Sequence, residues 1–209
     1  MLRAWGAVLA HRGSQAGEVT SDIRTGTSLG TVTREIAGVL ERVHATQSAQ
    51  LDALASALAE APRVFVHGLG RSGLALRMTA MRLMHLGFDV HVVGETTAPA
   101  IGDGDVLLTA SGSGTTGGIV RAAETARDAG ARVLALTTDA ASDLATLAAV
   151  VVVIPAAGKT DRSGQASAQY AGSLFEQAVV LVGDALFDVL WHRSGATADE
   201  LWPRHTNLE

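Results

Sequence analysis

A short segment of this 209-residue chain alternates hydroxyl-bearing residues with glycine directly after an apolar run. It reads LTASGSGTTGG from Leu108 to Gly118 and includes Ser111, Ser113 and Thr116. Hydroxyl groups donate hydrogen bonds, and glycine lets backbone N–H groups close around an anion without a Cβ in the way. This pattern predicts a cradle for a phosphate group.

A second glycine-rich turn, GLGRSG over residues 68–73, also follows an apolar run and precedes a helical pattern. Neither turn is a P-loop, because the terminal Gly-Lys-Ser/Thr is missing, and neither carries the acidic residue that a dinucleotide fingerprint requires. Glycine and serine also cap helices without any ligand, which for one such turn alone is an equally good interpretation. Two such turns after two apolar runs favour an anion site.

The elements that must position these turns can be predicted from five short apolar runs, each bounded by Gly, Pro, Asp or Thr. Helical patterns alternate with them, most clearly at 72–86 and 116–129. This order predicts an α/β fold, a three-layer α/β/α sandwich of flavodoxin-like type with a five-stranded parallel sheet. Ligands of such sheets lie outside the carboxyl ends of the strands, where both turns fall. The predicted strands are 63–68, 89–94, 105–110, 132–138 and 149–155.

The flanking segments differ in composition. Residues 1–30 are rich in Gly, Ser and Thr with little periodicity, which predicts a poorly packed N-terminal arm before a single domain over 31–209. Apolar residues at helical spacing from Val32 to Pro62 predict one or two amphipathic helices. The remaining predicted segments are a polar loop at 156–171, a long helix at 172–193, a short helix at 198–202 and a charged tail.

The composition excludes several classes of protein and site. A net charge of -5 and a pI near 5.8 give no electrostatic reason to bind nucleic acid or an anionic membrane, so an anion must be bound locally. The absence of cysteine excludes disulfides and thiolate metal sites and fits a cytoplasmic protein. No apolar run approaches the roughly 20 residues of a membrane span.

At this point the motifs resemble those of a known family. SGSGTT fits the S-x-S-G-x-T phosphate motif of SIS (sugar isomerase) domains. The segments GLGRSG, MRLMHLGFDVHVVGETTAPAIGDGD, GSLFEQ and RHTNLE together resemble the 6-phospho-3-hexuloisomerases of that family over about residues 32–209. The resemblance implies an isomerase of the ribulose monophosphate pathway, usually a homotetramer, that interconverts D-arabino-hex-3-ulose 6-phosphate and D-fructose 6-phosphate. It also implies a functional pairing with hexulose-6-phosphate synthase, which supplies the substrate by fixing formaldehyde.

The resemblance implies a set of substrate-binding residues. The phosphate would be bound by the serine-rich turn and by one residue of the second turn, and three further residues would line the sugar end. This chain departs from the family in its additional N-terminal arm and in having Gly-Thr-Thr where many relatives have Gly-Glu-Thr. The phosphate ligands implied are Ser72, Ser111, Gly112, Ser113 and Thr116, and the sugar-end residues are Arg71, Glu95 and Thr97.

The implied reaction needs a base to take the C2 proton, a cis-enediol intermediate and return of a proton at C3. The resemblance assigns the base to Glu176, a carboxylate in the first turn of the long helix, with Glu95 as the alternative. A glutamate there also simply complements the helix dipole. A second group should move protons between the two oxygens or polarise them, and His205 has the near-neutral pKa for it. We expect the tail that carries His205 to reach a neighbouring subunit's pocket.

No step of this reaction requires a metal ion or a redox cofactor, and we expect none. His67, His85 and His91 fall on strand or helix positions where a packed or surface histidine is commoner than a metal ligand. Two other functions remain open. One is another SIS isomerase, acting on arabinose 5-phosphate or sedoheptulose 7-phosphate. The other is a non-catalytic regulator that binds a sugar phosphate, although the first 60 residues show no basic recognition helix.

Overall fold

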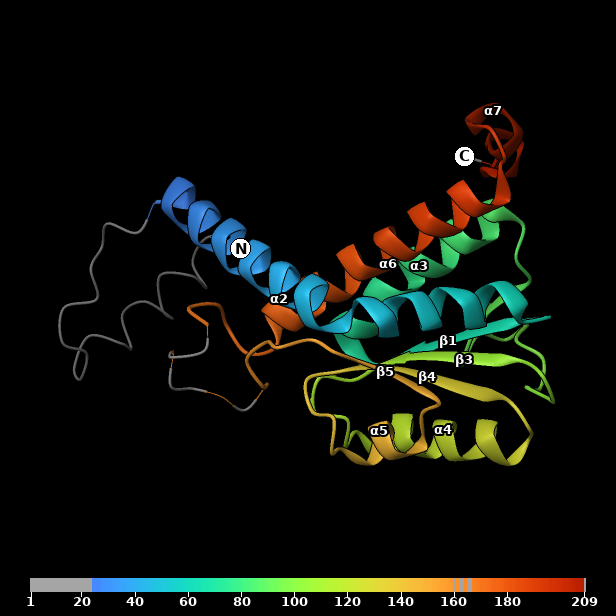
Figure 1. Cartoon of the computed structure of the whole chain (residues 1–209), viewed down its shortest axis with the longest axis horizontal. Helices are drawn as coiled ribbons and strands as arrows, with labels where there is room; N and C mark the ends of the chain where they lie inside the picture. The colour runs from blue at the N-terminus through green and yellow to red at the C-terminus, as the bar shows by residue number, and fades with distance from the viewer. Residues whose placement is uncertain (1–23, 160, 162–163, 165–166, 209) are drawn as a thin grey trace, which may run out of the picture.

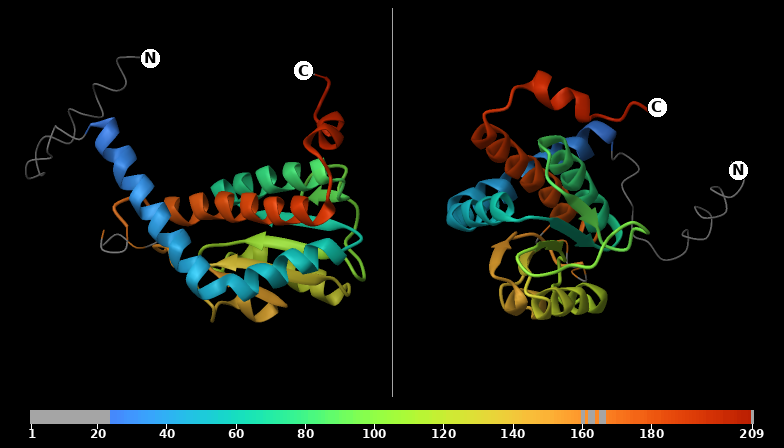
Figure 2. Two further views of the ribbon diagram at one scale, coloured as in Figure 1. Left: turned by 45° about the horizontal axis from the view of Figure 1, so that its top comes forward. Right: turned by 90° about the vertical axis from the view of Figure 1, so that its right-hand side faces the viewer.

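The computed structural model describes residues 24–159, 161, 164 and 167–208. These residues form three layers, with a parallel sheet between two groups of helices (Figures 1 and 2). Helices α2, α3 and α6 cover one face of the sheet, and α4 and α5 cover the other (Figure 1). The predicted α/β/α sandwich is confirmed. No helix of the described part of the chain is both long and apolar enough to cross a membrane.

The sheet has five parallel strands in the order β2-β1-β3-β4-β5. The central pair β1 and β3 is in register from Val64 opposite Val106 to Gly68 opposite Ala110. All five predicted runs form strands, each one to three residues shorter at its ends than the apolar run. The strands are β1 (Val64–Gly68), β2 (Val90–Val92), β3 (Val106–Ala110), β4 (Arg132–Thr137) and β5 (Val150–Val153).

This strand order creates a crevice between β1 and β3. The chain leaves β1 into α3 (Gly70–Leu86) on one face of the sheet and leaves β3 into α4 (Gly117–Asp128) on the other. Because the two connections turn in opposite directions, their first residues flank a gap at the carboxyl ends of the strands. The topology therefore brings together the two glycine-rich turns that the sequence singled out.

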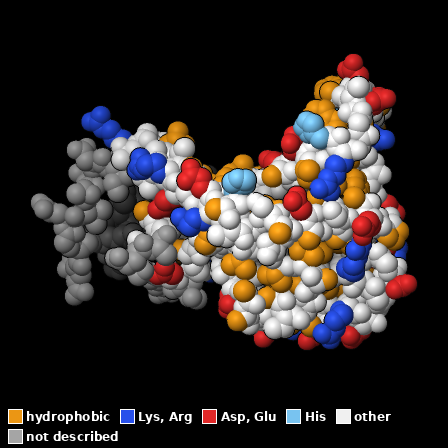
Figure 3. All heavy atoms as spheres, viewed as in Figure 1, with side chains coloured by type: hydrophobic (Ala, Val, Ile, Leu, Met, Phe, Trp, Pro, Cys, Tyr) orange, Lys and Arg blue, Asp and Glu red, His pale blue; other side chains and the backbone are white. Residues whose placement is uncertain are grey.

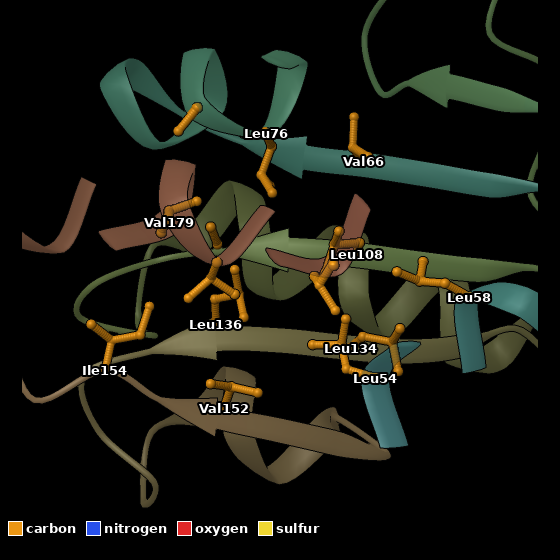
Figure 4. Packing of buried hydrophobic residues seen from close by; sticks show 14 of the residues in the cluster. Leu54, Leu58, Val66, Leu76, Leu108, Leu134, Leu136, Val152, Ile154 and Val179 are labelled. Atoms are coloured by element: carbon orange, nitrogen blue, oxygen red, sulfur yellow. The ribbon is translucent and has the colours of Figure 1, made fainter. Parts of the chain in front are cut away.

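The core lies on both faces of the sheet because the strand residues alternate. Val66, Leu108 and Leu136 face α2, α3 and α6 (Ser173–Ser194), whereas Phe65 and Leu107 face α4 and the short helix α5 (Asp143–Leu147). Figure 4 shows the first cluster, in which side chains of three helices meet those of four strands. Each fully buried leucine contributes about 1.5–3 kcal/mol of hydrophobic stabilisation.

Helix α2 (Thr25–Glu60) is one continuous helix of 36 residues, and its first part projects beyond the sheet (Figure 1). The sequence predicts an arm up to residue 30, but residues 25–30 belong to this helix. They were missed because they are exposed, or nearly so, and carry no apolar stripe. A helix propagates into such residues from a packed part, since each added residue gains one hydrogen bond. The rest of the predicted arm, residues 1–23, lies outside the described residues.

Gly73 lets the first turn of α3 contact the end of β1. A Cβ at Gly73 would collide with the carbonyl oxygen of Gly68, which belongs to the rigid strand. We therefore expect Gly73→Ala to push α3 away from the sheet and to lower the free energy of unfolding by about 3 kcal/mol, as overpacking does. Urea unfolding measures this loss. Gly26→Ala is the control, because a Cβ there meets no atom within 4 Å, and a stability unchanged in Gly73→Ala would contradict this packing.

Candidate active site

A cavity of about 300 Å³ opens at the crevice between β1 and β3. The turn after β1 and the loop after β3 form two of its walls, and the start of α6 with the segment after β5 forms the third. The sequence-predicted residues that line it are Arg71, Ser72, Ser111, Gly112, Ser113, Thr116 and Glu176. The fold thus brings seven of the ten predicted site residues to one cavity.

The serine-rich loop is held in a fixed shape by its own hydrogen bonds. The Ser111 Oγ accepts a bond of 3.2 Å from the Gly114 backbone N–H and lies 3.1 Å from Thr116 Oγ1. Thr115 donates to Ser113 Oγ through both its backbone N–H and its hydroxyl. Since both of these bonds use the oxygen of Ser113 as acceptor, the Ser113 hydroxyl proton remains to donate to a ligand.

The end of β4 and the residues that follow it support this loop from behind. The carbonyl oxygen of Gly112 accepts from the Thr138 backbone N–H at 3.0 Å and from the Thr138 hydroxyl at 2.7 Å. Gly114 has a φ of +63° and packs directly on Ser142, so that any Cβ there would collide with the serine side chain. The loop geometry therefore requires glycine at position 114.

Three helix N-termini meet at the cavity, and no side chain caps any of them. The N-cap residues are Leu69 for α3, Thr116 for α4 and Gly172 for α6, and all three line the cavity. The Thr116 hydroxyl, which could have capped α4, is directed to Ser111 instead. Uncapped N-termini present free backbone N–H groups and the positive ends of their helix dipoles. The cavity is therefore suited to an anion, and helix capping does not account for the serine and threonine hydroxyls.

Two oppositely charged side chains lie at one side of this cavity. Glu176 lies in the first turn of α6, and its carboxylate forms an ion pair with the Nε of Arg71, from the first turn of α3. The Glu176 side chain is 19% exposed, whereas that of Arg71 is 63% exposed. The arrangement holds a carboxylate at a fixed orientation beside the phosphate-type cradle, which is the geometry that proton transfer to or from a bound sugar needs.

The structure does not bring Glu95 and Thr97 into this cavity. Both belong to the connection after β2, at the edge of the sheet, and both are exposed. The carboxylate of Glu95 pairs with Arg77 of α3, with 2.5 Å between Oε1 and Nη2. Glu95 instead lines a separate, mainly apolar cavity of about 280 Å³ beside α4.

His205 lies at the opposite end of α3 from the cavity. Its ring stacks on that of His85 in the last turn of α3, with 3.9 Å between ring centroids, and the adjacent Arg204 donates to the His85 carbonyl at 3.0 Å. Arg71 and His85 are separated by 14 residues of helix, about 21 Å at 1.5 Å per residue. The His205 of one chain therefore does not reach the cavity of the same chain.

Among the cavity residues that the sequence interpretation did not name, two bear directly on its charge and shape. Lys159, in the segment after β5, carries a second positive charge to the cavity, and Phe175 packs against Gly112. The place of Lys159 after the carboxyl end of a parallel strand could have indicated it. Nothing in the sequence distinguished Phe175 from the other apolar residues of the long helix.

The histidines singled out in the sequence are packed among other side chains. His67, at the end of β1, is half-buried, and burial lowers its pKa despite a hydrogen bond with the Gly118 backbone. Burial likewise lowers the pKa of His85, with the neighbouring His205 and Arg82 acting in the same direction. The described residues contain no group of three or more histidine and carboxylate side chains placed to hold a metal ion.

Comparison with known proteins identifies the family of this chain. A model of the SIS domain matches residues 57–180. The chain is 54% identical over 191 residues to the 3-hexulose-6-phosphate isomerase of Mycobacterium gastri, covering 91% of this chain and 94% of the relative. It is 34% identical to the Bacillus subtilis protein of the same name, covering 85% and 98%.

A solved structure of a hypothetical protein from Methanococcus jannaschii, for which a molecular function of 3-hexulose-6-phosphate isomerase was inferred, superimposes with a TM-score of 0.75. The two chains are 28% identical, and the match covers 87% of this chain and 99% of that one. The resemblance seen in the motifs is thereby confirmed over most of the chain. This chain belongs to the SIS domain family.

Proposed function

We propose that this protein is an isomerase that interconverts D-arabino-hex-3-ulose 6-phosphate and D-fructose 6-phosphate through a cis-enediol. The observation that carries the proposal is the convergence of three uncapped helix N-termini and a serine-rich loop beside the Glu176 carboxylate. The names of the M. gastri and B. subtilis relatives support the same activity, since 3-hexulose-6-phosphate isomerase and 6-phospho-3-hexuloisomerase are one enzyme.

The chemistry follows from the substrate. The 3-ketose cannot close a five-membered ring onto O6, which carries the phosphate, so it enters in open-chain form. Glu176 takes the proton from C2 to give an enediolate, O3 gains a proton while O2 loses its own, and Glu176 returns the proton to C3, which leaves the carbonyl at C2 and a hydroxyl at C3. Arg71 pairs with the carboxylate and Lys159 lines the same cavity, and their charges stabilise the charge that develops on the two oxygens.

We propose that the protein assembles as a homotetramer and that His205 acts in the active site of a neighbouring subunit. The surface formed by α3 and α6 is concave, and it lies between the projecting start of α2 and the C-terminal segment (Figures 1 and 3). Side chains that are at least half exposed on α3 include Leu74, Met78 and Met81, an apolar stripe that a second copy would cover. Only through such assembly does His205 come near a Glu176 carboxylate.

The proposed substrate also suggests a cellular setting. The 3-ketose phosphate arises when a synthase adds formaldehyde to ribulose 5-phosphate, so we propose a functional pairing with hexulose-6-phosphate synthase in the ribulose monophosphate pathway. The cysteine-free sequence fits the reducing cytoplasm, where we place the reaction. No part of the proposed chemistry uses a metal ion or an organic cofactor.

A coupled assay tests the proposed activity. Purified hexulose-6-phosphate synthase generates the substrate from formaldehyde and ribulose 5-phosphate, and we expect the protein to convert it to fructose 6-phosphate. Arabinose 5-phosphate and sedoheptulose 7-phosphate are offered in parallel. Turnover of either of these in place of the hexulose phosphate would overturn the proposed substrate, and tight binding of fructose 6-phosphate without any turnover would indicate a regulator.

Ser113→Ala should raise KM for the hexulose phosphate while leaving kcat little changed. The Ser113 hydroxyl proton is free to donate to the phosphate, and a lost hydrogen bond to a charged group costs roughly 1–3 kcal/mol, or about 5- to 150-fold in KM. Steady-state kinetics measures the change. Thermal unfolding is the control, and we expect it to be unaltered because Ser113 is exposed. An unaltered KM would argue against the phosphate cradle.

A further inference from the structure

Glu35 of α2 binds the segment that leads into the active-site helix. Its carboxylate accepts hydrogen bonds from the Ser167 hydroxyl at 2.7 Å, the Ala168 backbone N–H at 2.7 Å and the Gln169 side-chain amide at 3.0 Å. More than 130 residues of sequence separate the two sides of this contact. We call these four residues the Glu35 clasp.

The clasp continues directly to the residue beside the proposed base. The Gln169 amide nitrogen donates to Glu35, while its amide oxygen accepts from the Gln177 side chain at 2.8 Å. Gln177 follows Glu176 on α6, and the Glu176 backbone N–H forms the first hydrogen bond of that helix, to the Gly172 carbonyl. One side chain therefore connects α2 to the first turn of α6.

The backbone between the clasp and α6 is strained. Ala171 has a φ of +51°, the only positive φ of a non-glycine residue among the residues that the structure describes. L-residues with a Cβ rarely adopt this conformation and keep it only where surrounding contacts enforce it. Ala171 lies between the Glu35 clasp and the start of α6, which are the contacts next to it along the chain.

We propose that Glu35 is a positioning residue of the active site, acting through Gln169 and Gln177 to set the first turn of α6 and the Glu176 carboxylate. The inference rests on the proposed function, and it concerns a residue on a helix that contributes no residue to the cavity lining. The hydroxyls of the phosphate cradle lie on the loop after β3, which is supported from behind by Thr138 and Ser142. The clasp therefore acts chiefly on the proton-transfer group, and it bears on the cradle through Gly172 and Phe175 at the start of α6.

Electrostatics keep the clasp formed at neutral pH. Burial raises the pKa of Glu35, but the hydrogen bonds from Ala168, Ser167 and Gln169 and the charge of the adjacent Arg34 outweigh it, so that the pKa lies below its ordinary value. A carboxyl with a lowered pKa contributes its stability above its ordinary pKa and loses it as the pH falls through the lowered value. Glu35 is thus an ionised acceptor wherever the enzyme works.

Kinetics of Glu35→Ala test the proposal. We expect kcat to fall about 10- to 100-fold, as it does when a reacting group is displaced by about 1 Å, with KM within about twofold of the wild type. Glu35→Gln keeps the size and one acceptor oxygen, so its loss should be intermediate. Glu41→Ala removes the same charge from an exposed position on the same helix and should keep full activity. A kcat equal to that of Glu41→Ala would overturn the proposal.

Hydrogen exchange provides a readout that does not depend on activity. In Glu35→Ala, amides of residues 167–176 should exchange faster than in Glu41→Ala, while those of 111–116 keep their wild-type rates. If the wild-type protein shows no isomerase activity, the proposed function fails. The comparison of exchange rates still tests whether Glu35 holds the segment before α6. Unchanged exchange over 167–176 would refute it.

A second variant tests the strained residue. Glycine adopts a positive φ without strain, so Ala171→Gly should make the first turn of α6 less dependent on the clasp. We expect the loss of kcat caused by Glu35→Ala to be smaller in the Ala171→Gly background than in the wild-type background. An equal loss in both backgrounds would contradict the role of the clasp in holding Ala171.

Discussion

We expect Glu176→Gln to abolish measurable isomerase activity and to leave the binding of fructose 6-phosphate intact. The amide keeps the shape of the carboxylate but cannot accept the C2 proton, and loss of a general base typically costs 10²- to 10⁴-fold in kcat. We expect affinity to be retained because the proposed phosphate ligands lie on the loop after β3 and at helix N-termini, and because Arg71 would lose its anionic partner and become available to the ligand. Steady-state turnover and calorimetric binding of fructose 6-phosphate measure the two effects separately.

The control for this experiment is Asp184→Asn on the same helix. Asp184 is exposed and lies in the middle of α6, eight residues and about 12 Å along the helix from Glu176, so its amide variant should keep the wild-type turnover. Full turnover in Glu176→Gln would instead assign the base to Glu95, in spite of its pairing with Arg77 outside the cavity.

We expect Arg71→Ala to produce the second largest effect, a loss of about 10²- to 10³-fold in kcat/KM. The variant removes the ion-pair partner that orients Glu176, and it also removes a positive charge from beside the reacting oxygens. Charged hydrogen bonds contribute about 1.5–3 kcal/mol each, and the orientation of the base adds to this loss. We expect both a lower kcat and a higher KM, since Arg71 faces carboxylate and substrate together.

Arg71→Lys distinguishes charge from geometry. Lysine keeps the positive charge but lacks the planar fork of the guanidinium, so part of the affinity should return while kcat stays low. Arg127→Ala, in the last turn of α4, removes a charge of the same sign at the other end of the sheet and should have no effect. Equal kinetics of Arg71→Ala and the wild type would show that the ion pair with Glu176 has no part in the reaction.

The sheet could be predicted from sequence because β1, β3 and β4 are largely buried on both faces, and because the partly buried edge strands β2 and β5 are apolar as well. Such strands appear as short continuous apolar runs, and glycine or aspartate marks their ends, as Gly68 and Asp105 do. Helix α5 could not be predicted in this way, because it has only five residues and its N-cap Ser142 resembles any loop serine. The start of α2 was missed because its residues are exposed. Their sequence does not distinguish the extension of a helix from an unpacked arm.

The candidate site was predictable where it depends on contiguous residues. The hydroxyls at positions 111, 113 and 116 are brought together by one loop, and the strand order then places that loop beside the turn at 68–73. The resemblance to the family supplied Glu176, which pattern alone could not separate from a glutamate that complements a helix dipole. Contacts between distant segments could not be predicted, which is why the hydrogen bonds of Glu35 became visible only in the structure.

The positions of Glu95 and Thr97, which the resemblance implied at the sugar end, could not be predicted from sequence either. Glu95 and Thr97 come shortly after a predicted strand, as phosphate-binding residues do, but that strand is β2 at the edge of the sheet. Its carboxyl end is separated from the β1–β3 crevice by the whole of β1. Within the single chain Glu95 and Thr97 therefore lie outside the candidate cavity, as His205 does.

A crystal structure of the protein with fructose 6-phosphate tests most directly how the substrate is bound. We predict phosphate oxygens within hydrogen-bond distance of the hydroxyls of Ser111, Ser113 and Thr116 and the Gly112 backbone, with C2 and C3 against the Glu176 carboxylate. A phosphate bound elsewhere, with this loop unoccupied, would contradict both the phosphate cradle and the assignment of the base.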